Sequence, residues 1–396
     1  MKVSFFSTCA KLCLCFIVAA VVVRAEPYET IVSNGDAGNR IDMVVVGDGY
    51  TADELGKYRT DVAQLIARMF LQDPYREYQT YFNVHRIDVT SAQSGADHPD
   101  RNPKVYVNTA FDATYNCAGT QRLVCVNQTR VREVARNTLA ANQYDMIVVL
   151  VNDPEYGGSG GSVAVGSTHP QVVELVLHEL GHSFGFLADE YDVGGTNCNL
   201  PSEPSAVNST IATARENIKW NHWIDDATPL PTIGSTPGVP GLYQGSSFCQ
   251  NNYYRPTHNS KMRSLGTPFE QINLEQHVRR IYTFVSPLDT VAPVATNIAI
   301  NYAQSQTFSV TTPQPATHNL EVTWLVDGVS RATGESFVLP AHTLASGTHT
   351  VEVVARDATG VVRRDPQSLL EERRSWTLSV APKRRATTRP RTRNQS

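Results

Sequence analysis

The sequence contains 396 residues, of which 41% are hydrophobic, enough for a sizeable core and too many for one average domain. The net charge is −4, but removing the cations of residues 1–25 and of residues 382–396 leaves a body of −13. Such an acidic body argues against nucleic acid as the main partner.

The first residues have the pattern of a targeting segment. Lys2 and Lys11 precede an apolar run from Leu12 to Val23, and small residues suited to cleavage follow it. This pattern predicts a signal peptide over residues 1–25 and a mature chain that starts near Glu26 and is exported to the extracellular space or the periplasm. The run is short for a membrane span, so we expect no stable membrane insertion, with an uncleaved anchor as the alternative.

Cysteine usage agrees with export. Cys9, Cys13 and Cys15 would leave with the signal peptide, and an even set of four remains. In an exported protein such a set favours disulfides, with three possible pairings. We prefer Cys117–Cys125 and Cys198–Cys249, because each pair lies in loop-like sequence. Zinc binding by these cysteines is disfavoured, since none are spaced as C-x-x-C.

Alternating strands and helices are expected over the first part of the chain. Apolar runs indicate buried strands, and apolar residues at helical spacing indicate helices. Thr51 and Glu54 make a capping box at the start of the first helix. The predicted strands are 41–46, 82–88 and 146–151, and the predicted helices are 55–69, 131–139, 171–184 and 274–284. This order is typical of a mixed α/β domain.

A glycine-rich segment, 156–161, separates the third strand from the residues Ser162–Gly166. It lacks the Gly-Lys-Ser/Thr ending of a nucleotide-binding loop. We interpret it as a flexible hinge before a short edge strand, whose free backbone groups could pair with an extended peptide.

The pattern changes after a linker at 287–293. Short β-like runs occur at 307–310, 321–326, 336–339, 348–356 and 375–380, with turn signals at 327–328 and 357–360. Their spacing predicts an all-β sandwich of immunoglobulin or fibronectin type over residues 287–381. The last residues, 382–396, are basic and are expected to be disordered.

The residues His178-Glu179-Leu180-Gly181-His182 form the strongest chemical motif in the sequence. Two histidines four residues apart share one face of a helix and can bind zinc. Zinc lowers the pKa of a bound water toward about 7, and Glu179 lies where it can take the proton of that water as a general base. The flanks of this helix are apolar almost all round, so the helix is buried and its polar side chains need partners. A metal supplies them, and a satisfied cluster of hydrogen bonds is the alternative.

A catalytic zinc also needs a third protein ligand and one open position. Gly185 could end the helix in a left-handed turn that brings a later residue back to the metal. We choose Asp189 as that ligand, with Glu190 as the runner-up and Asp192 third.

The motif and its flanks resemble the IgA-peptidase-like metallopeptidases, also called igalysins, which group with the metzincins. The resemblance rests on HELGHSFG followed by Ala188-Asp189-Glu190-Tyr191, on the opening IDMVVVGDGY, and on the later segment Asn259–Leu265. It is expected to cover about Ile41 to Phe284. It implies a metzincin-like catalytic domain over residues 26–286, with Met262 in a turn beneath the metal.

The sequence departs from the usual metzincin pattern at Ser264, where many metzincins have a tyrosine two residues after the methionine, and at the third ligand. The third ligand should stand three residues after the glycine, at Ala188, which cannot bind zinc. Asp189 is one position later, which is similar to the igalysin version.

These residues predict a secreted zinc-dependent endopeptidase that hydrolyses protein or peptide substrates through a zinc-bound water activated by Glu179. The resemblance does not extend to immunoglobulin A as a substrate, because the cleft loops decide substrate choice. Two other hypotheses remain open: a secreted binding protein that keeps a structural zinc, and a zinc amidase acting on cell-wall or small amide substrates.

Overall fold

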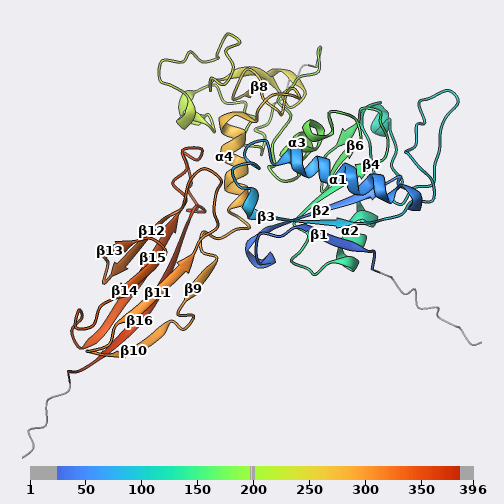
Figure 1. The fold of residues 1–396 in the computed structure, drawn as a ribbon. Coiled ribbons are helices and arrows are strands. Elements are labelled where there is room, and N and C mark those ends of the chain that lie inside the picture. The colour runs from blue at the N-terminus through green and yellow to red at the C-terminus, as the bar shows by residue number, and fades with distance from the viewer. Residues whose placement is uncertain (1–24, 197, 199–200, 384–396) are drawn as a thin grey trace, which may run out of the picture.

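The computed structural model describes residues 25–196, 198 and 201–383 (Figure 1). Residues 1–24 of the predicted signal peptide and residues 384–396 of the predicted tail lie outside the described residues. Within the described part of the chain, no helix is both long and apolar enough to span a bilayer.

A six-stranded mixed sheet forms the centre of the first half of the chain. Its strands are β1 (Tyr28–Val32), β2 (Ile41–Asp48), β3 (Phe82–Ile87), β4 (Met146–Val151), β5 (Gly158–Ser159) and β6 (Ala164–Ser167). Their order is β1-β3-β2-β4-β6-β5. The four inner strands are parallel, and β1 and β5 pair antiparallel at the two edges. The inner strands are fully buried, because helices or loops cover both faces.

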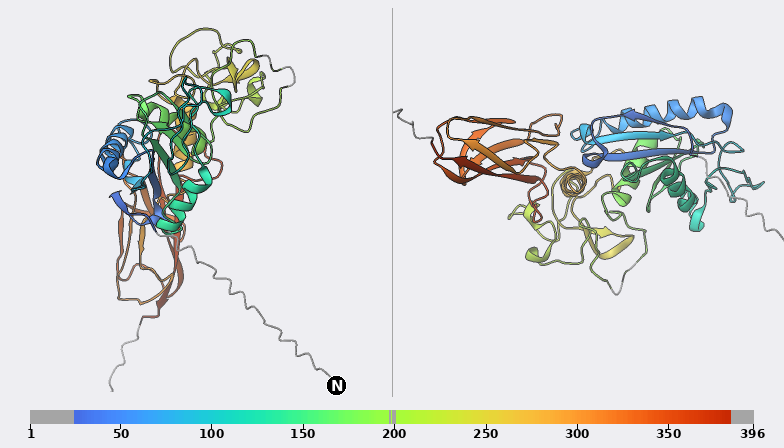
Figure 2. Two further views of the ribbon diagram at one scale, coloured as in Figure 1. Left: turned by 90° about the vertical axis from the view of Figure 1, so that its right-hand side faces the viewer. Right: turned by 90° about the horizontal axis from the view of Figure 1, so that it is seen from below.

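The two faces of the sheet have separate hydrophobic cores. Helices α1 (Leu55–Met69), α3 (Val172–Ser183) and α4 (Glu270–Ile281) pack on the face to which Met43 and Val45 point. Helix α2 (Gln128–Thr138) packs on the other face, against Val44 and Val46. Figure 2 shows α1 lying along one side of the sheet.

Most of the predicted elements are present with shifted ends. The capping box of Thr51 and Glu54 forms and leads through a short 3-10 turn into α1. Helix α2 begins three residues earlier than predicted and α4 begins four residues earlier, because the added residues are mostly polar and extend beyond the apolar pattern used to place the helices.

The prediction for the glycine-rich segment is wrong in one respect. Gly158 and Ser159 do not form a hinge but make strand β5, which pairs with β6 at Gly166 and Val165. The β6 strand is therefore internal and β5 is the edge. Glycines allow this strand to lie close to its neighbours, since a Cβ at position 158 would come within 2.8 Å of the Val165 carbonyl.

A long irregular region lies between α3 and α4. The described residues of this region form short 3-10 turns and a hairpin of β7 (Tyr243–Ser246) and β8 (Cys249–Arg255). Both predicted disulfides form: Cys117–Cys125 closes a short loop after β3, and Cys198–Cys249 joins this irregular region to β8.

The last part of the described chain is a sandwich of two sheets. One sheet has the order β10-β16-β15-β12-β13 and the other the order β14-β11-β9. Phe308 of the smaller sheet and Trp324 and Trp376 of the larger one are fully buried between them. The strands are β9 (Thr290–Ala292), β10 (Asn297–Asn301), β11 (Gln306–Thr311), β12 (Glu321–Val326), β13 (Val329–Thr333), β14 (Ser336–Leu339), β15 (Gly347–Arg356) and β16 (Glu371–Ala381).

Sequence patterns missed β9, β10 and β13. Strand β9 has only three residues and lies inside the predicted linker. The two prolines that bound this segment indicated a loop and not a strand. The turn predicted at Asp327 and Gly328 is present as the hairpin between β12 and β13, and both residues have positive φ.

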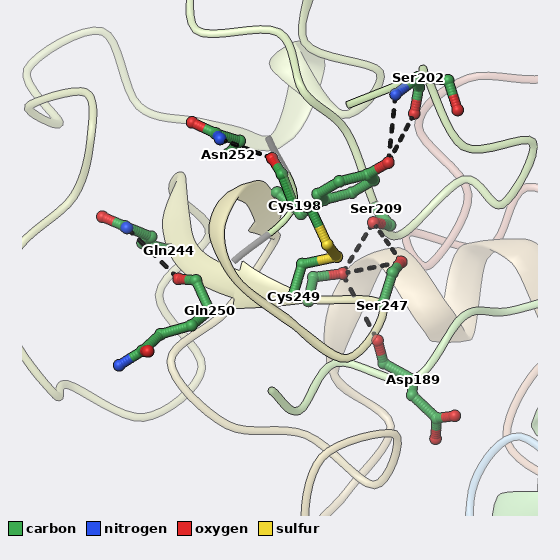
Figure 3. Close-up of a disulfide and its surroundings, with 11 residues drawn as sticks. Asp189, Cys198, Ser202, Ser209, Gln244, Ser247, Cys249, Gln250 and Asn252 are labelled. Carbon is green, nitrogen blue, oxygen red and sulfur yellow. Dashed lines mark hydrogen bonds between the residues drawn. A yellow bond between two sulfur atoms is a disulfide. The ribbon is translucent and has the colours of Figure 1, made fainter. Parts of the chain in front are cut away.

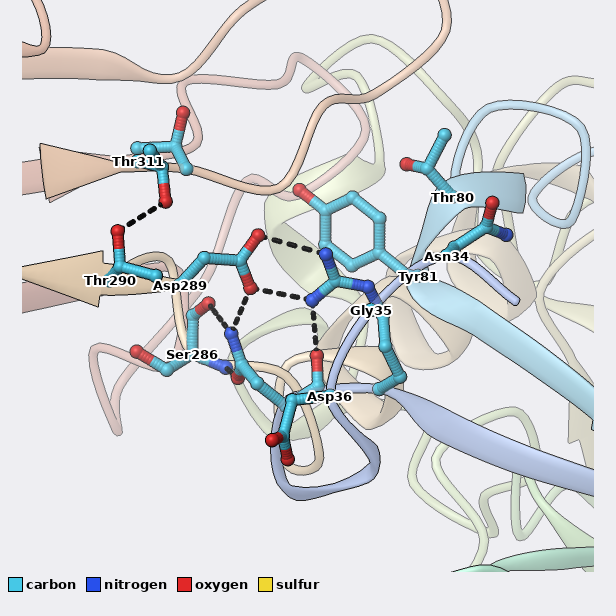
Figure 4. Close-up of polar contacts among 12 residues, drawn as sticks. Asn34, Gly35, Asp36, Thr80, Tyr81, Ser286, Asp289, Thr290 and Thr311 are labelled. Carbon is cyan, nitrogen blue, oxygen red and sulfur yellow. Dashed lines mark hydrogen bonds and ion pairs between the residues drawn. The ribbon is translucent and has the colours of Figure 1, made fainter.

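Polar contacts join the sandwich to the first half of the chain. Asp289, just before β9, pairs with Arg40 at 2.6 Å and accepts from the side-chain amide of Asn39, which also contacts Ser286 (Figure 4). Arg40 is 6% exposed, so this ion pair is largely shielded from water.

A second contact centres on Asp357, which follows β15 and is 2% exposed. Its carboxylate accepts from the hydroxyls of Tyr78 (2.8 Å) and Tyr282 (2.7 Å) and contacts His318 at 2.7 Å. Buried polar groups of both parts of the chain are thus satisfied by one carboxylate.

Asp357→Ala is expected to lower the free energy of unfolding by about 3 kcal/mol, because the two tyrosine hydroxyls and His318 lose a buried acceptor. Urea denaturation of the purified protein measures the change. The matched control is Glu321→Ala, which removes an exposed carboxylate from β12 of the same sandwich and should cost less than about 1 kcal/mol. Equal losses in both variants would contradict the role given to Asp357.

Candidate metal centre

Helix α3 places the motif histidines at the edge of the core. Its apolar residues Val173, Val176, Leu177 and Leu180 pack into the first core, on the side of the sheet that α1 covers. His178, Glu179 and His182 lie on the remaining face, where each offers an atom within 4.8 Å of the others. Because the apolar face of α3 is buried in the core, the face with the motif residues points away from that core.

Asp189 completes a triangle with the two histidines. Its Oδ1 atom lies 3.2 Å from Nε2 of His178 and 3.3 Å from Nε2 of His182, and the two Nε2 atoms are 3.3 Å apart. Four tetrahedral ligands at about 2.0–2.1 Å from a zinc ion are about 3.3–3.4 Å from one another. The three atoms therefore have the spacing of one face of a zinc tetrahedron.

Hydrogen bonds of the two imidazoles select the form that binds metal. Nδ1 of His178 donates to the Lys261 carbonyl at 2.9 Å, and Nδ1 of His182 donates to the Leu187 carbonyl at 2.8 Å. A carbonyl can only accept, so each Nδ1 carries a proton, which leaves Nε2 as the ring nitrogen available to a metal.

The charges at the triangle also fit a cation. Oδ1 of Asp189 is buried, and no donor among the described residues makes a hydrogen bond of good geometry with it. Burial raises the pKa of Asp189, but the adjoining His178 and His182 more than offset it and lower the pKa to about 2. Burial lowers the pKa of His182, but Asp189 outweighs it and raises that pKa to about 9. The carboxylate is thus ionised beside a protonated His182, and a zinc ion that displaced this proton would take over as its positive partner.

The neighbouring Glu190 points away from this triangle. It is fully buried and accepts from the side-chain amides of Asn208 (3.0 Å) and Asn273 (2.8 Å) and from the hydroxyl of Ser260 (2.7 Å). Burial raises the pKa of Glu190, and these three donors lower it. Asp192 lies instead near Arg263, at 4.0 Å. Of the three acids weighed from sequence, only Asp189 lies at the histidines.

The turn between His182 and Asp189 differs from the prediction. Gly185 does not adopt a left-handed conformation; Phe186 does, with φ of 56°. Gly185 is instead required for space, because a Cβ there would lie 2.7 Å from the Gly181 carbonyl and 3.0 Å from His277. The turn is closed by hydrogen bonds from the Phe186 amide to the His182 carbonyl and from the Leu187 amide to the Gly181 carbonyl.

The segment that contains Met262 lies directly beneath the helix. A Cβ at Gly181 would come within 2.3 Å of the Met262 sulfur, so the glycine permits this contact. The Met262 carbonyl accepts from the Glu190 amide at 2.8 Å. Lys261 is 1% exposed and pairs with Glu174, one turn before His178. Burial lowers the pKa of Lys261 and the Glu174 carboxylate raises it, with a net lowering. Through these contacts the segment packs against α3 both before the motif, at Glu174, and within it, at Gly181.

An open cleft of about 890 Å³ lies over the triangle. Its floor includes His178, Glu179, His182 and Asp189. Its sides are lined by the loop of the first disulfide and the glycine-rich segment after β4: Thr120, Arg122, Leu123, Tyr156, Gly158, Gly160 and Gly161. They are also lined by the segment after Asp189, the β7–β8 turn and the methionine segment: Tyr191, Val193, Phe248, Arg263, Ser264 and Leu265.

Glu179 is 8% exposed at the base of this cleft. Burial raises its pKa, and the adjacent His178 and His182 lower it, with a net increase. Gly160 approaches it closely, since a Cβ at that position would lie 2.8 Å from Oε2 of Glu179. A carboxylate with a raised pKa beside a cation site is suited to take up and return a proton.

Sequence analysis missed the residues of the cleft walls. Arg122, Tyr191 and Phe248 come from segments far apart in the chain, and Arg122 packs over the ring of Tyr191 at 5.9 Å. Only the two cysteine pairs, which close both wall loops, hinted that these segments are fixed in place.

Asp189→Asn is expected to lower zinc affinity at least a hundredfold, because a charged ligand is lost. Glu190→Gln, one residue away, should keep zinc affinity within about tenfold but lower stability, because it disturbs a buried acceptor. Competition with a chromophoric chelator measures affinity, and urea denaturation measures stability. The reverse pattern would identify Glu190 as the ligand.

Stability should also depend on His277, which is fully buried on α4 against Gly185. Burial lowers its pKa from 6.5 to about 4, although the Asn273 carbonyl opposes this. The unfolded chain therefore binds more protons than the folded one between these pH values, and stability falls as the pH drops through this range. From pH 7 to pH 4.5 the loss due to His277 should be about 2 kcal/mol.

The measurement is urea denaturation of metal-free protein at both pH values, for the wild type and His277→Gln. The variant should lose less stability on acidification than the wild type by the same amount. Identical pH dependence in the two proteins would show that His277 does not remain neutral in the folded state.

The family model described as IgA Peptidase M64 matches residues 30–236, which include the motif and Asp189. The match starts before the expected Ile41 and ends before the methionine segment, whose likeness to the family stays a prediction. No curated protein matches the chain.

Among solved structures, the fibronectin(III)-like modules of Clostridium thermocellum CbhA match at 15% identity, over 24% of this chain and 98% of theirs, with a TM-score of 0.18. A quinonprotein alcohol dehydrogenase-like protein of Bacteroides thetaiotaomicron matches at 10% identity, over 24% of this chain and 20% of its own, also with a TM-score of 0.18. The family match, which spans just over half of the 396 residues, is decisive. The chain belongs to the IgA peptidase family M64 and is a metallopeptidase.

Proposed function

We propose that this metallopeptidase is a secreted, zinc-dependent endopeptidase with a metzincin-like catalytic domain. His178, His182 and Asp189 would hold the ion, and Glu179 would act as the general base. The observation that carries the proposal is the triangle of ligand atoms, 3.2–3.3 Å apart, at the base of an open cleft that also contains the Glu179 carboxylate.

When bound, zinc polarises the scissile carbonyl and makes a water molecule more acidic. The three candidate ligands would hold the ion from one side, and the cleft over them would leave a fourth position open, as in catalytic rather than structural zinc sites. A structural site would also have no use for a buried carboxylate beside its ligands.

Glu179 is suited to the proton transfers. Its carboxylate takes the proton from the attacking water and then donates it to the leaving amine, so that the free amine departs. Gly158 and Gly160 leave the space above this carboxylate open, where side chains would fill it. The Lys261 and Leu187 carbonyls keep the histidine rings oriented during these steps.

The cleft also favours an extended protein chain as substrate. The outer side of β5 is partly occupied at Gly158, where the Arg122 carbonyl and the Val124 amide form hydrogen bonds with it. Gly160 and Gly161 line the cleft beyond this paired part, so a substrate backbone would lie along these residues. Two disulfides in the described residues agree with an oxidising compartment.

Glu179→Gln is expected to lower hydrolysis of casein or gelatin by about 10²–10⁴-fold while the protein keeps its zinc, because the amide cannot accept the proton. The rate is measured with purified mature protein, and the zinc content is assayed alongside. Glu133→Gln on the exposed face of α2 is the control and should keep the wild-type rate.

A chelator should abolish the activity of the wild type, and added zinc should restore it. Zinc-loaded wild-type protein that hydrolyses neither substrate, or a Glu179→Gln variant that hydrolyses them at the wild-type rate, would contradict the proposal.

A further inference from the structure

The turn between β7 and β8 has an unusual backbone. Its two residues, Ser247 and Phe248, have φ values of 53° and 66°. The left-handed region suits glycine or asparagine and disfavours a bulky side chain such as phenylalanine. A phenylalanine kept in this conformation is a sign that its side chain has a function at that place.

Several bonds hold this turn against the chain that follows Asp189. The Ser247 amide donates to the Asp189 carbonyl at 2.9 Å, and the Phe248 amide donates to the Tyr191 carbonyl at 3.1 Å. The Val193 amide donates back to the Phe248 carbonyl at 3.1 Å. The disulfide from Cys249 to Cys198 fixes the next residue (Figure 3). The turn is therefore rigid, and its position is tied to a candidate metal ligand.

The ring of Phe248 packs against one neighbouring ring and is otherwise exposed to solvent. It is 47% exposed and meets the Tyr191 ring edge-on, with 5.3 Å between the ring centres. Val193, which is bonded to the same turn, is 51% exposed. Both residues line the cleft above the motif, as does Leu123 from the loop of the first disulfide.

We propose that Phe248, together with Val193, forms an apolar subsite that receives a large apolar or aromatic side chain of the peptide substrate next to the scissile bond. This assignment rests on the proposed endopeptidase function. A rigid ring gains the contact without losing conformational entropy when the substrate binds, so it contributes more to selectivity than a mobile side chain.

The chemistry of the subsite favours an apolar occupant over a charged one. The side chains of Phe248 and Val193 offer no hydrogen-bond donors, and a charged substrate side chain would lose water there without a partner. Of the two arginines that line the cleft, Arg122 lies over the ring of Tyr191, 5.9 Å from its centre. The other, Arg263, lies 4.0 Å from the Asp192 carboxylate.

The test compares internally quenched peptides of one sequence in which each position beside the scissile bond carries phenylalanine, leucine, alanine or aspartate in turn. The wild type should prefer phenylalanine or leucine over alanine at one of these positions. Phe248→Asn should lower the ratio of kcat/KM for the phenylalanine peptide to that for the alanine peptide by about tenfold or more. Asparagine accepts the left-handed conformation, so the backbone of the turn is retained.

Two further variants separate the role of the ring from its structural context. Phe186→Asn removes another exposed phenylalanine with positive φ, which packs on Arg280 outside the cleft, and it should leave the ratio unchanged. Phe248→Trp should keep the preference for large apolar side chains. Zinc content is measured for each variant, because the turn contacts the Asp189 backbone.

The outcomes distinguish this inference from the proposed function. Hydrolysis by the wild type with a ratio that Phe248→Asn does not change would overturn the subsite, as would a preference for aspartate at every position. A zinc-loaded wild type that cleaves no peptide of the series would overturn the endopeptidase function, and the subsite with it.

Discussion

The buried carboxylate of Glu190 holds together the segments that surround the candidate metal ligands. It accepts hydrogen bonds from Asn208 in the irregular region, from Ser260 in the methionine segment and from Asn273 on α4. These three donors come from parts of the chain that are otherwise joined by long loops. Because Asp189 is the preceding residue, the same network that satisfies Glu190 also fixes the direction of Asp189.

Helix α4 extends this network to the β-sandwich. Glu275, two residues after Asn273, accepts the backbone amides of Arg363 and Arg364 at 2.7 and 2.8 Å. The guanidinium of Arg363 also lies 3.9 Å from the ring centre of Trp223. The loop between β15 and β16 is thus bonded to the helix that carries one donor to Glu190. The sandwich is in this sense part of the support for the metal centre, and not only an appended module.

The local parts of the site could be predicted from sequence, and the long-range parts could not. His178, Glu179 and His182 lie on one helix, so their spacing alone fixes their relation. Asp189 required a choice among nearby acids, which only packing settles: the longer Glu190 side chain reaches buried donors that sequence patterns do not locate. The sequence predicts a left-handed turn at Gly185, but in the structure it is the lack of space for a side chain, and not a positive φ, that requires glycine at this position.

The sheet shows the same limit. Long buried strands such as β2 and β4 have continuous apolar runs that sequence analysis finds directly. Strand β5 has two residues and no apolar signal, and it exists because β6 and the Arg122 carbonyl supply partners for its backbone. Strand pairing of this kind depends on neighbours that are distant in sequence, so composition indicates a loop where the structure has an edge strand.

The walls of the cleft explain why both disulfides lie where they do. Side chains such as Phe248 and Val193, which are 47% and 51% exposed in the cleft, gain little from the hydrophobic effect, so the segments that carry them need another source of order. The loop with Arg122 and Leu123 is closed by Cys117–Cys125, and the turn with Phe248 is fixed by Cys198–Cys249. Covalent closure replaces the missing burial, and the chain-entropy account gives about 4 kcal/mol for a loop such as the second, whose cysteines are 51 residues apart. The cleft is therefore ordered by bonds that depend on an oxidising environment, while the motif below it is ordered by a core that does not.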